Sequence, residues 1–337
     1  MNENQVFDER LADRFGRVHN SLRISVTDRC NIRCFYCMPA EGVVFKSRRE
    51  ILRFEEIVRF VQVVAGMGVD RLRITGGEPL VRSDLDRLIE QLIAVPGIRE
   101  VALTTNGMLL ARHAQRLKDA GLDRINISLD TMREEVFQQI SRRPGLDQVF
   151  QGIAAAQRVG FRKLRLNAIA LRGITEDEAA PLCRFARRQG LHLRFIEFMP
   201  LDADSRWQTD HVLTGRQLRE ILQAEFGPLT PVERDDPSQP AVDYRYADRM
   251  GQVGFINSVT EPFCQSCNRL RLTAEGQVRN CLFSDEEWDV RSLIRGGGSD
   301  DEIAHVVRDC VGAKKAGHGS DDISFVRPTR AMYQIGG

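Results

Sequence analysis

Between residues 22 and 199 the chain repeats one pattern, in which a short β-rich run is followed by a helical stretch. The six β-rich runs are LRISVT, DRLRITGG, EVALTTNG, DRINISLD, KLRLNAIAL and LHLRFIEFM. The segments between them, such as RFEEIVRFVQVVAGMG, carry apolar residues at helical spacing and often end in glycine. Strands that alternate with helices predict an α/β fold with a parallel sheet. Right-handed crossovers would curl six such units into a partial barrel or an open parallel sheet.

The βα pattern stops after Gly227, and the rest of the chain is organised differently. The stretch DDPSQPAVD is rich in aspartate and proline, which indicates a surface loop. We therefore expect an N-terminal extension over residues 1–21, a partial barrel over residues 22–228 and a smaller C-terminal domain over residues 229–337. The predicted fold class is α/β, an incomplete (βα)6 TIM-like barrel that the C-terminal domain closes.

The strands of this barrel alternate polar and apolar side chains, whereas buried parallel strands are usually almost continuously apolar. Successive side chains of a strand point to opposite faces, so each strand has one polar face. These faces carry Arg23, Ser25 and Thr27 in the first strand, Arg73 and Thr75 in the second, Asn126, Ser128 and Asp130 in the fourth, and Lys163, Arg165 and Asn167 in the fifth. If the apolar faces pack on the helices, Arg23, Arg73 and Arg165 point into one cavity, which is costly unless an anionic ligand pairs with them. The alternative is that some of these arginines lie at strand ends and reach water.

Six of the eight cysteines form two closely spaced groups. Residues 1–20 have no apolar core, and no run approaches the about 20 apolar residues of a membrane span, so we expect a cytoplasmic location and no membrane partner. Thiols stay reduced in the cytoplasm, which favours metal ligation or redox chemistry over disulfides. Cys183 and Cys310 stand alone and are expected to be ordinary buried thiols.

The balance of charges argues against a polyanionic partner. Lysine and arginine number 48 and aspartate and glutamate 47, so no overall field draws the protein to nucleic acid or to an anionic membrane. Any affinity for anions must come from local clusters of charge.

The first triplet (Cys30, Cys34 and Cys37) has the spacing CxxxCxxC directly after the first strand. A 4Fe-4S cluster normally takes four thiolates, so three close cysteines indicate one open iron. An open iron can chelate a small molecule, which is typical of radical S-adenosylmethionine (SAM) enzymes. The alternatives are a zinc site that uses the CFYC pair with ligands from elsewhere, or a redox pair.

The second triplet (Cys264, Cys267 and Cys281) consists of CQSC and a third cysteine beyond a predicted hairpin. Strand alternation places Arg269 and Arg271 on one face of that hairpin. No fourth protein ligand lies close by in the sequence, although His305 or His318 could serve. A structural zinc site is the alternative to a second cluster with an open iron.

Polar or glycine-rich motifs follow the other strands at the same ends. GGEP follows the second strand, TTNG the third, SLD the fourth and MP (Met199, Pro200) the sixth. The carboxyl ends of the strands in a βα barrel form one mouth, where active sites are built. Each motif alone is explained by a turn, but together with a cysteine triplet they predict one site.

Together these residues resemble the GTP 3',8-cyclase family, radical SAM enzymes that begin molybdenum cofactor biosynthesis. The resemblance extends from Leu22 to the terminal IGG, and the two differently spaced triplets with that ending are jointly specific. It implies that the first triplet holds a 4Fe-4S cluster that binds and cleaves SAM, and that the second holds an auxiliary 4Fe-4S cluster whose open iron faces the guanine. It implies SAM contacts at Tyr36, Gly77, Ser128 and Met199, and GTP contacts at Arg23, Arg73, Thr104, Arg165, Arg269 and Arg271.

The fifth strand and the C-terminal tail bear further on this resemblance. Arg165 stands where the family often has lysine, and Lys163 on the same strand face is the alternative GTP contact. The family's double glycine reaches into the active site, so Gly336 and Gly337 join Arg269 and Arg271 as candidates to support catalysis. Without the resemblance, the tail would be interpreted as a frayed terminus. No residue is assigned as the proton donor.

The implied reaction converts GTP to 3',8-cyclo-7,8-dihydro-GTP and begins when a 5'-deoxyadenosyl radical takes hydrogen from the ribose C3'. The resemblance also implies an external electron donor, the next enzyme of the pathway as a partner, and a homodimer. One rival is another two-cluster radical SAM enzyme, such as a peptide-modifying maturase. The other is a non-enzymatic zinc or redox-sensing protein. The arginine-lined cavity and the IGG ending favour a nucleotide over a peptide.

Overall fold

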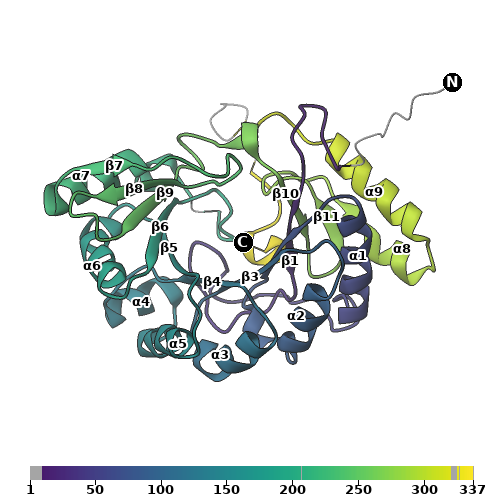
Figure 1. Cartoon of the computed structure of the whole chain (residues 1–337), viewed down its shortest axis with the longest axis horizontal. Coiled ribbons are helices and arrows are strands. Elements are labelled where there is room, and N and C mark those ends of the chain that lie inside the picture. The colour runs from purple at the N-terminus through teal and green to yellow at the C-terminus, as the bar shows by residue number, and fades with distance from the viewer. Residues whose placement is uncertain (1–9, 206, 320–324, 326, 337) are drawn as a thin grey trace.

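The computed structural model describes residues 10–205, 207–319, 325 and 327–336, and the strands of these residues form one 12-stranded sheet. Its centre consists of six adjacent parallel strands, one from each predicted β-rich run. They are β1 (Ser21–Ser25), β2 (Arg71–Thr75), β3 (Glu100–Thr105), β4 (Arg124–Ser128), β5 (Leu164–Ala170) and β6 (His192–Glu197). Figure 1 shows that the sheet curves into an arc. The predicted βα repeat is confirmed.

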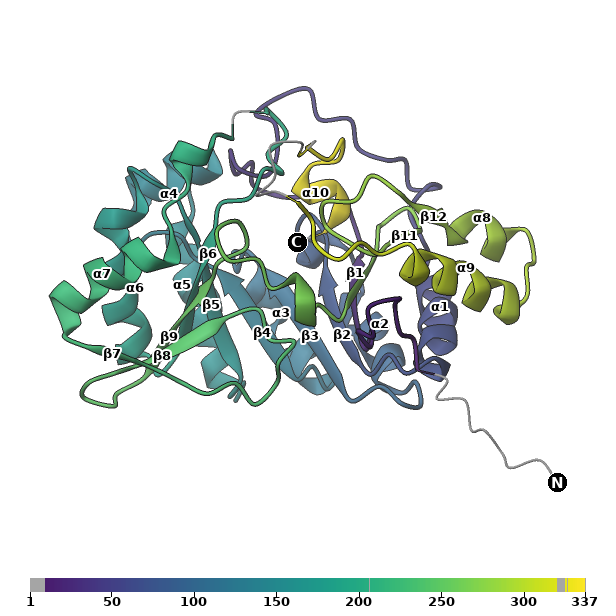
Figure 2. The same ribbon diagram turned by 90° about the horizontal axis from the view of Figure 1, so that it is seen from above.

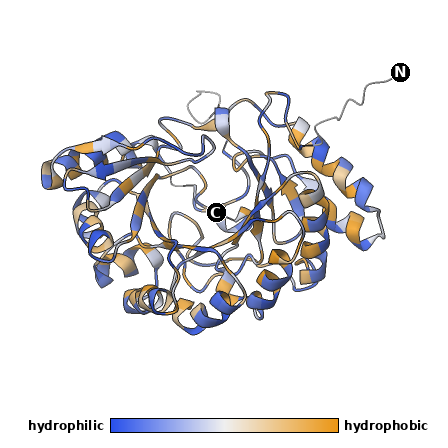
Figure 3. Cartoon of the chain, viewed as in Figure 1, coloured by the Kyte–Doolittle hydropathy of each residue, from blue (hydrophilic) through white to orange (hydrophobic). Residues whose placement is uncertain are grey.

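Helices connect the strands and lie outside the arc (Figures 1 and 2). They are α1 (Phe54–Gly66), α2 (Leu85–Ile93), α3 (Leu110–Asp119), α4 (Glu134–Ser141), α5 (Leu146–Arg158), α6 (Thr175–Arg188) and α7 (Gly215–Phe226). Each buries one apolar stripe and exposes a polar one, as the mixed colours of these helices in Figure 3 indicate. In α2, for example, the buried residues Leu85, Leu88 and Leu92 recur at helical spacing. No helix in the described part of the chain is long and apolar enough to cross a membrane.

The C-terminal part of the chain extends the same sheet at both edges. Its elements are β7 (Leu229–Pro231), β8 (Val242–Tyr246), β9 (Gln252–Ile256), β10 (Arg269–Leu272), β11 (Gln277–Arg279), β12 (Trp288–Asp289), α8 (Val290–Arg295), α9 (Asp300–Gly312) and α10 (Met332–Ile335). Strand β9 pairs parallel with β6, and β10 pairs parallel with β1. Two strand pairings therefore join the C-terminal part to the six-stranded centre.

The sheet does not close into a barrel, because it ends at β12 on one side and at β7 on the other. The predicted incomplete α/β barrel is thus confirmed. The chain's described C-terminal end, with α10, lies inside the arc (Figure 1). The proposed boundaries of the three segments stay a prediction.

The loop between β7 and β8 differs from the expectation of an ordinary surface loop. Asp236, Ser238, Gln239 and Pro240 line the central cavity. The Asp236 carboxylate accepts a hydrogen bond from the guanidinium of Arg71 at the start of β2. The loop therefore closes the cavity beside the amino ends of the strands. Its polar composition identified a loop but did not reveal what the loop covers.

Candidate active site

One cavity of about 460 Å³ lies within the arc, where the polar faces of the strands meet loops of the C-terminal part. All six clustered cysteines line it. So does every SAM or GTP contact that the resemblance implies: Tyr36, Gly77, Ser128, Met199, Arg23, Arg73, Thr104, Arg165, Arg269 and Arg271. This volume is in the range of cavities that bind a small molecule or parts of a cofactor and a substrate together. The structure therefore brings both triplets and all these side chains to one place.

The first triplet lies on the loop that follows β1. The backbone amides of Cys37 and Met38 both donate to the Cys34 carbonyl, at 2.9 Å, and close a tight turn around the triplet. Burial raises the pKa of the Cys30 thiol to about 11, and the Glu78 carboxylate adds to this shift. Burial also holds the pKa of Cys34 well above its usual range, with a further contribution from Asp130. Metal must therefore displace protons from these thiols when it binds.

The second triplet has a contrasting electrostatic environment. Cys264 begins a short 3-10 turn (Cys264–Ser266), Cys267 ends it, and Cys281 follows β11. Burial alone would raise the pKa of Cys267, but the charges of Arg269 and Lys314 outweigh it and lower this pKa to about 6. The guanidinium of Arg269 lies 3.5 Å from the Cys267 sulfur. Cys267 is thus prepared as a thiolate, the form that binds metal.

The donors of both triplets are thiols that lie near one another. Among the described residues, no group of three or more His, Cys, Asp or Glu side chains is placed to hold one metal ion. Ligands of one ion converge on a point, whereas the three cysteines of a cubane each bind a different iron. The first triplet's thiols still lie close enough to influence one another's ionisation, as do those of the second. The donors present are thiolates, which suit iron-sulfur clusters.

His305 and His318, the possible fourth ligands of the second triplet, have different positions. His305 is exposed on α9, and its ring nitrogen lies 3.5 Å from the Asp309 carboxylate. His318 lines the cavity, and its ring lies 4.6 Å from the ring of Phe283. His305 is therefore outside the site, while His318 borders it. Cys183 and Cys310 are buried free thiols, as expected.

The GGEP segment packs directly on the loop of the first triplet. A Cβ on Gly77 would collide with the Arg29 carbonyl oxygen, and one on Gly76 would lie 2.6 Å from the Thr27 carbonyl oxygen. The Gly77 amide donates to Thr27 and the Glu78 amide donates to Arg29, at 2.7 and 2.8 Å. Glycine is required here because two backbone segments touch.

Glu78 joins the GGEP and TTNG segments. Its carboxylate accepts hydrogen bonds from the Thr105 hydroxyl and the Asn106 amide, both at 2.7 Å, and from the Leu80 amide at 3.0 Å. Burial raises the pKa of Glu78 to about 7, against the effect of these three donors. The Asn106 side chain in turn donates to Asn31, next to Cys30. Glu78 therefore positions the loops around the first triplet.

Tyr36 and Asp130 form a second link across the cavity. The Tyr36 hydroxyl donates to Asp130 at 2.7 Å, and the other carboxylate oxygen accepts from the Ile169 amide at 2.8 Å. Burial raises the pKa of Asp130, while these hydrogen bonds oppose the shift. The first triplet is thus tied to the ends of β4 and β5. Ser128 and Met199 also line the cavity.

The arginines of the strands point into the cavity as predicted. Burial, reinforced by neighbouring arginines, lowers the pKa of Arg23 and of Arg73. None of Arg23, Arg73 and Arg165 forms an ion pair with a carboxylate among the described residues. The buried hydroxyl of Thr104 and the buried carbonyl of Asn126 also have no hydrogen-bond partner there. This lining has the donors and acceptors that a polyanionic ligand with polar groups requires.

Sequence reasoning missed further charges at this site. Arg124 and Arg194 line the cavity and are paired with Glu100 at 2.5 Å and with Asp243 at 3.1 Å. Both lie on the polar faces of their strands, so the alternation that revealed Arg23 could have revealed them. Lys314 was also missed, because it follows α9 in a segment with no local pattern. Lys163 is exposed and does not line the cavity, whereas Arg165 does.

The C-terminal tail docks inside the arc beside β1. The carbonyl of Gly336 accepts a hydrogen bond from the buried guanidinium of Arg271, at 2.5 Å. Gly336 has φ +85°, and a Cβ there would lie 2.9 Å from the Cβ of Ser25 and 3.0 Å from the Cγ2 of Thr75. Only glycine suits both this conformation and this space. Gly337, the other predicted supporting residue, lies outside the described residues.

Comparisons with known proteins agree with this site. The model of the Radical SAM superfamily matches residues 24–186, and that of Molybdenum Cofactor Synthesis C matches residues 191–320. Among solved structures, Streptococcus suis SuiB bound to S-adenosylmethionine has a TM-score of 0.60 at 14% identity, over 86% of this chain and 68% of that one. SuiB bound to precursor peptide SuiA has a TM-score of 0.61 at 15% identity, and the match covers 87% of this chain and 68% of that one. At such identities the likeness shows the fold alone. Fold, triplets and family model together define a radical SAM enzyme.

Full-length relatives identify the family. The GTP 3',8-cyclase of Rhodopirellula baltica is 51% identical over 97% of this chain and 92% of its own length. That of Paenarthrobacter nicotinovorans is 44% identical over 97% of both chains, and that of Streptomyces coelicolor is 43% identical over 97% and 96%. The chain belongs to the GTP 3',8-cyclase family. The predicted family is confirmed, and with it a radical SAM enzyme that uses SAM and two 4Fe-4S clusters.

Proposed function

We propose that the protein converts GTP to 3',8-cyclo-7,8-dihydro-GTP, the first step of molybdenum cofactor biosynthesis. The relatives named as GTP 3',8-cyclases and the two matching family models support this activity. The observation that carries it is the cavity between the two triplets, in which Arg23, Arg73 and Arg165 have no carboxylate partner among the described residues. A triphosphate supplies the negative charge that these cations need.

At one end of the cavity, Cys30, Cys34 and Cys37 would hold the first cluster, and Tyr36, Gly77, Ser128 and Met199 would contact SAM. SAM bound at the open iron supplies a 5'-deoxyadenosyl radical when it receives one electron. Glu78 and Asp130 keep the surrounding loops in place through their hydrogen bonds.

At the other end, Cys264, Cys267 and Cys281 would hold the auxiliary cluster, which would supply a binding site for the guanine. Arg269 and Arg271 would bind GTP beside it, and Arg23, Arg73, Thr104 and Arg165 would bind its remaining polar groups. The chain's task is to orient GTP so that a hydrogen atom leaves the ribose C3' and a bond forms between C3' and the guanine C8. One electron and one proton then complete the product. Gly336, hydrogen-bonded to Arg271, is a candidate to support this geometry.

The remaining partners are also proposals. An external donor would supply the electrons, the next enzyme of the pathway would receive the product, and the protein would act as a homodimer in the cytoplasm. The overall charge balance gives no reason to expect a nucleic-acid partner.

Anaerobic reconstitution with iron and sulfide, followed by SAM, GTP and a reductant, tests this function. We expect mass spectrometry to detect 5'-deoxyadenosine together with a cyclised isomer of GTP. Production of 5'-deoxyadenosine with unchanged GTP would contradict the substrate and favour a rival such as a peptide-modifying maturase. Absence of bound iron with intact SAM would contradict the enzyme class and favour a zinc or redox-sensing protein.

A further inference from the structure

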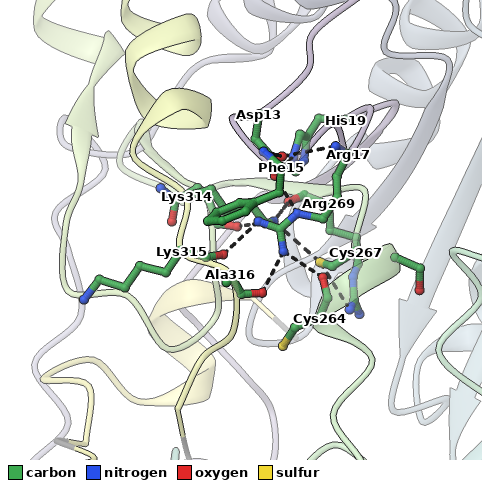
Figure 4. A network of polar contacts seen from close by, with 12 residues as sticks. Asp13, Phe15, Arg17, His19, Cys264, Cys267, Arg269, Lys314, Lys315 and Ala316 are labelled. Atoms are coloured by element: carbon green, nitrogen blue, oxygen red, sulfur yellow. Dashed lines mark hydrogen bonds and ion pairs between the residues drawn. The ribbon is translucent and has the colours of Figure 1, made fainter.

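Lys314 lies just beyond α9 and is 3% exposed, although its side chain carries a charge. Its ammonium group lies 3.5 Å from the Cys267 sulfur, and donates to the carbonyl oxygens of Arg269 at 3.1 Å and Asn280 at 2.7 Å. An ammonium has three donors, so these contacts satisfy all of them. Figure 4 shows Lys314 beside Arg269 and Cys267.

These three contacts join the two segments that carry the second triplet. Cys267 ends the CQSC turn, Arg269 begins β10, and Asn280 directly precedes Cys281. The Asn280 side chain adds a hydrogen bond to the Cys310 carbonyl of α9, at 2.7 Å. One buried lysine therefore connects both ends of the triplet to the end of a helix.

The backbone around Lys314 is itself held by the N-terminal segment. The guanidinium of Arg17 donates to the carbonyl oxygens of Lys315 at 2.7 Å, Ala316 at 2.9 Å and Cys264 at 2.8 Å. Asp13 accepts a hydrogen bond from the same guanidinium at 2.6 Å (Figure 4). Arg17 thus fixes the segment after Lys314 to the first cysteine of the triplet.

The charges around the two triplets differ in sign. At the first triplet, the carboxylates Glu78 and Asp130 act on the thiols more strongly than the cation Arg33. At the second, Arg269 and Lys314 each lie 3.5 Å from the Cys267 sulfur. Lys314 is the cation with further backbone bonds to Arg269 and Asn280, so its place is set by the fold rather than by substrate. A cation fixed beside a ligand sulfur stabilises the more negative, reduced state of a cluster.

We propose that Lys314 is a positioning residue for the second triplet. Its hydrogen bonds hold the triplet together, and its ammonium group places a fixed positive charge beside the Cys267 sulfur. This inference rests on the proposed role of that triplet as cluster ligands. The charge would favour reduction of the auxiliary cluster, and the three hydrogen bonds would slow loss of its iron.

The test uses the full-length protein with Cys30, Cys34 and Cys37 replaced by alanine, so that only the auxiliary cluster is observed. Lys314→Met, Lys314→Gln and Lys314→Arg are compared with Lys315→Met, which removes the same charge from an exposed neighbour. A redox titration followed by electron paramagnetic resonance gives the reduction midpoint, and a colorimetric chelator gives the rate of iron loss.

In Lys314→Met we expect the ratio of reduced to oxidised cluster at a given potential to fall about tenfold, which is about 59 mV for one electron. We also expect severalfold faster iron loss. Lys314→Arg keeps the charge and should keep the midpoint, whereas Lys315→Met should match the parent in both measurements. A Lys314→Met protein identical to Lys315→Met in midpoint and iron loss would overturn the inference.

If Lys314→Met does not fold, as judged by circular dichroism, the midpoint of Lys314→Gln tests the inference instead. Its amide keeps a hydrogen-bond donor and removes the charge. A parent-like midpoint in Lys314→Gln overturns the inference, and a lowered one supports it. A parent protein that binds no iron at all would overturn the proposed role of the second triplet as well. A bound cluster that is insensitive to Lys314 overturns only the inference about the lysine.

Discussion

Half-buried arginines that form no ion pair with a carboxylate among the described residues are the most informative single residues of this protein. Arg23, Arg73 and Arg165 each lie on the polar face of a strand and line one cavity. Burying a cation costs several kcal/mol unless an anion compensates it. The unliganded site therefore holds electrostatic strain that a polyphosphate relieves, so binding affinity and stability of the free protein should respond to mutation in opposite directions.

Arg165→Met should raise the Kd for GTP by about tenfold to hundredfold, because a charge-assisted hydrogen bond contributes about 1.5–3 kcal/mol. Equilibrium dialysis with the reconstituted protein measures this change. The same replacement should leave the thermal stability of the unliganded protein unchanged or higher, since Arg194 and Arg124 repel this half-buried cation more than Asp243 and Glu100 attract it. Lys163→Met is the matched control, because Lys163 is exposed two residues away. If Lys163→Met weakened GTP binding and Arg165→Met left it unchanged, Lys163 rather than Arg165 would be the GTP contact.

At the scale of elements, the loops at the carboxyl ends of the strands support one another. The GGEP segment after β2 packs on the cysteine loop after β1, and Glu78 connects it to the loop after β3. Tyr36 and Asp130 connect the cysteine loop to β4 and β5. Because these hydrogen bonds run between loops, the position of the first triplet depends on all of them.

Gly77→Ala should displace the loop of the first triplet, because its Cβ would collide with the Arg29 carbonyl oxygen. We expect a destabilisation of about 1–3 kcal/mol, typical of overpacking. Iron and sulfide analysis should show loss of one of the two clusters, with the other retained. Gly66→Ala in α1 is the control, since nothing lies within 4 Å of a Cβ there. Full occupancy of both clusters in Gly77→Ala would contradict the prediction.

At the scale of the whole molecule, the single sheet joins parts of the chain that the sequence separates. Strand β10 covers the free edge of β1, and β9 covers that of β6. Unpaired edges of a sheet promote association with other chains. The C-terminal part also supplies Arg269, Arg271 and the second triplet to the cavity. The cavity therefore exists only in the complete sheet.

A fragment of residues 1–228 should not fold as a stable unit, because it leaves the edges of β1 and β6 unpaired. We expect aggregation, or a broad thermal transition in circular dichroism, whereas the full chain should unfold cooperatively. Co-expression with residues 229–337 should restore soluble protein. A sharp transition of the isolated fragment near that of the full chain would show instead that the partial barrel is autonomous.

Local periodicity alone determined the centre of the fold and much of the site. Period-2 alternation identified the strands and placed Arg23, Arg73 and Arg165 on their polar faces, because side-chain direction follows from the strand itself. The close spacing of Cys30, Cys34 and Cys37 identified the first triplet, and a predicted hairpin between Cys267 and Cys281 identified the second. The alternation of side chains along a strand would also have identified Arg124 and Arg194.

Only the tertiary structure decided which distant segments meet. It paired β10 with β1, brought the loop at Asp236 over the cavity, and placed the tail at Gly336 against Arg271. It set Lys314 beside Cys267, 47 residues away, and Arg17 beside Cys264, 247 residues away. No local pattern encodes such pairs, because each depends on how the complete chain packs.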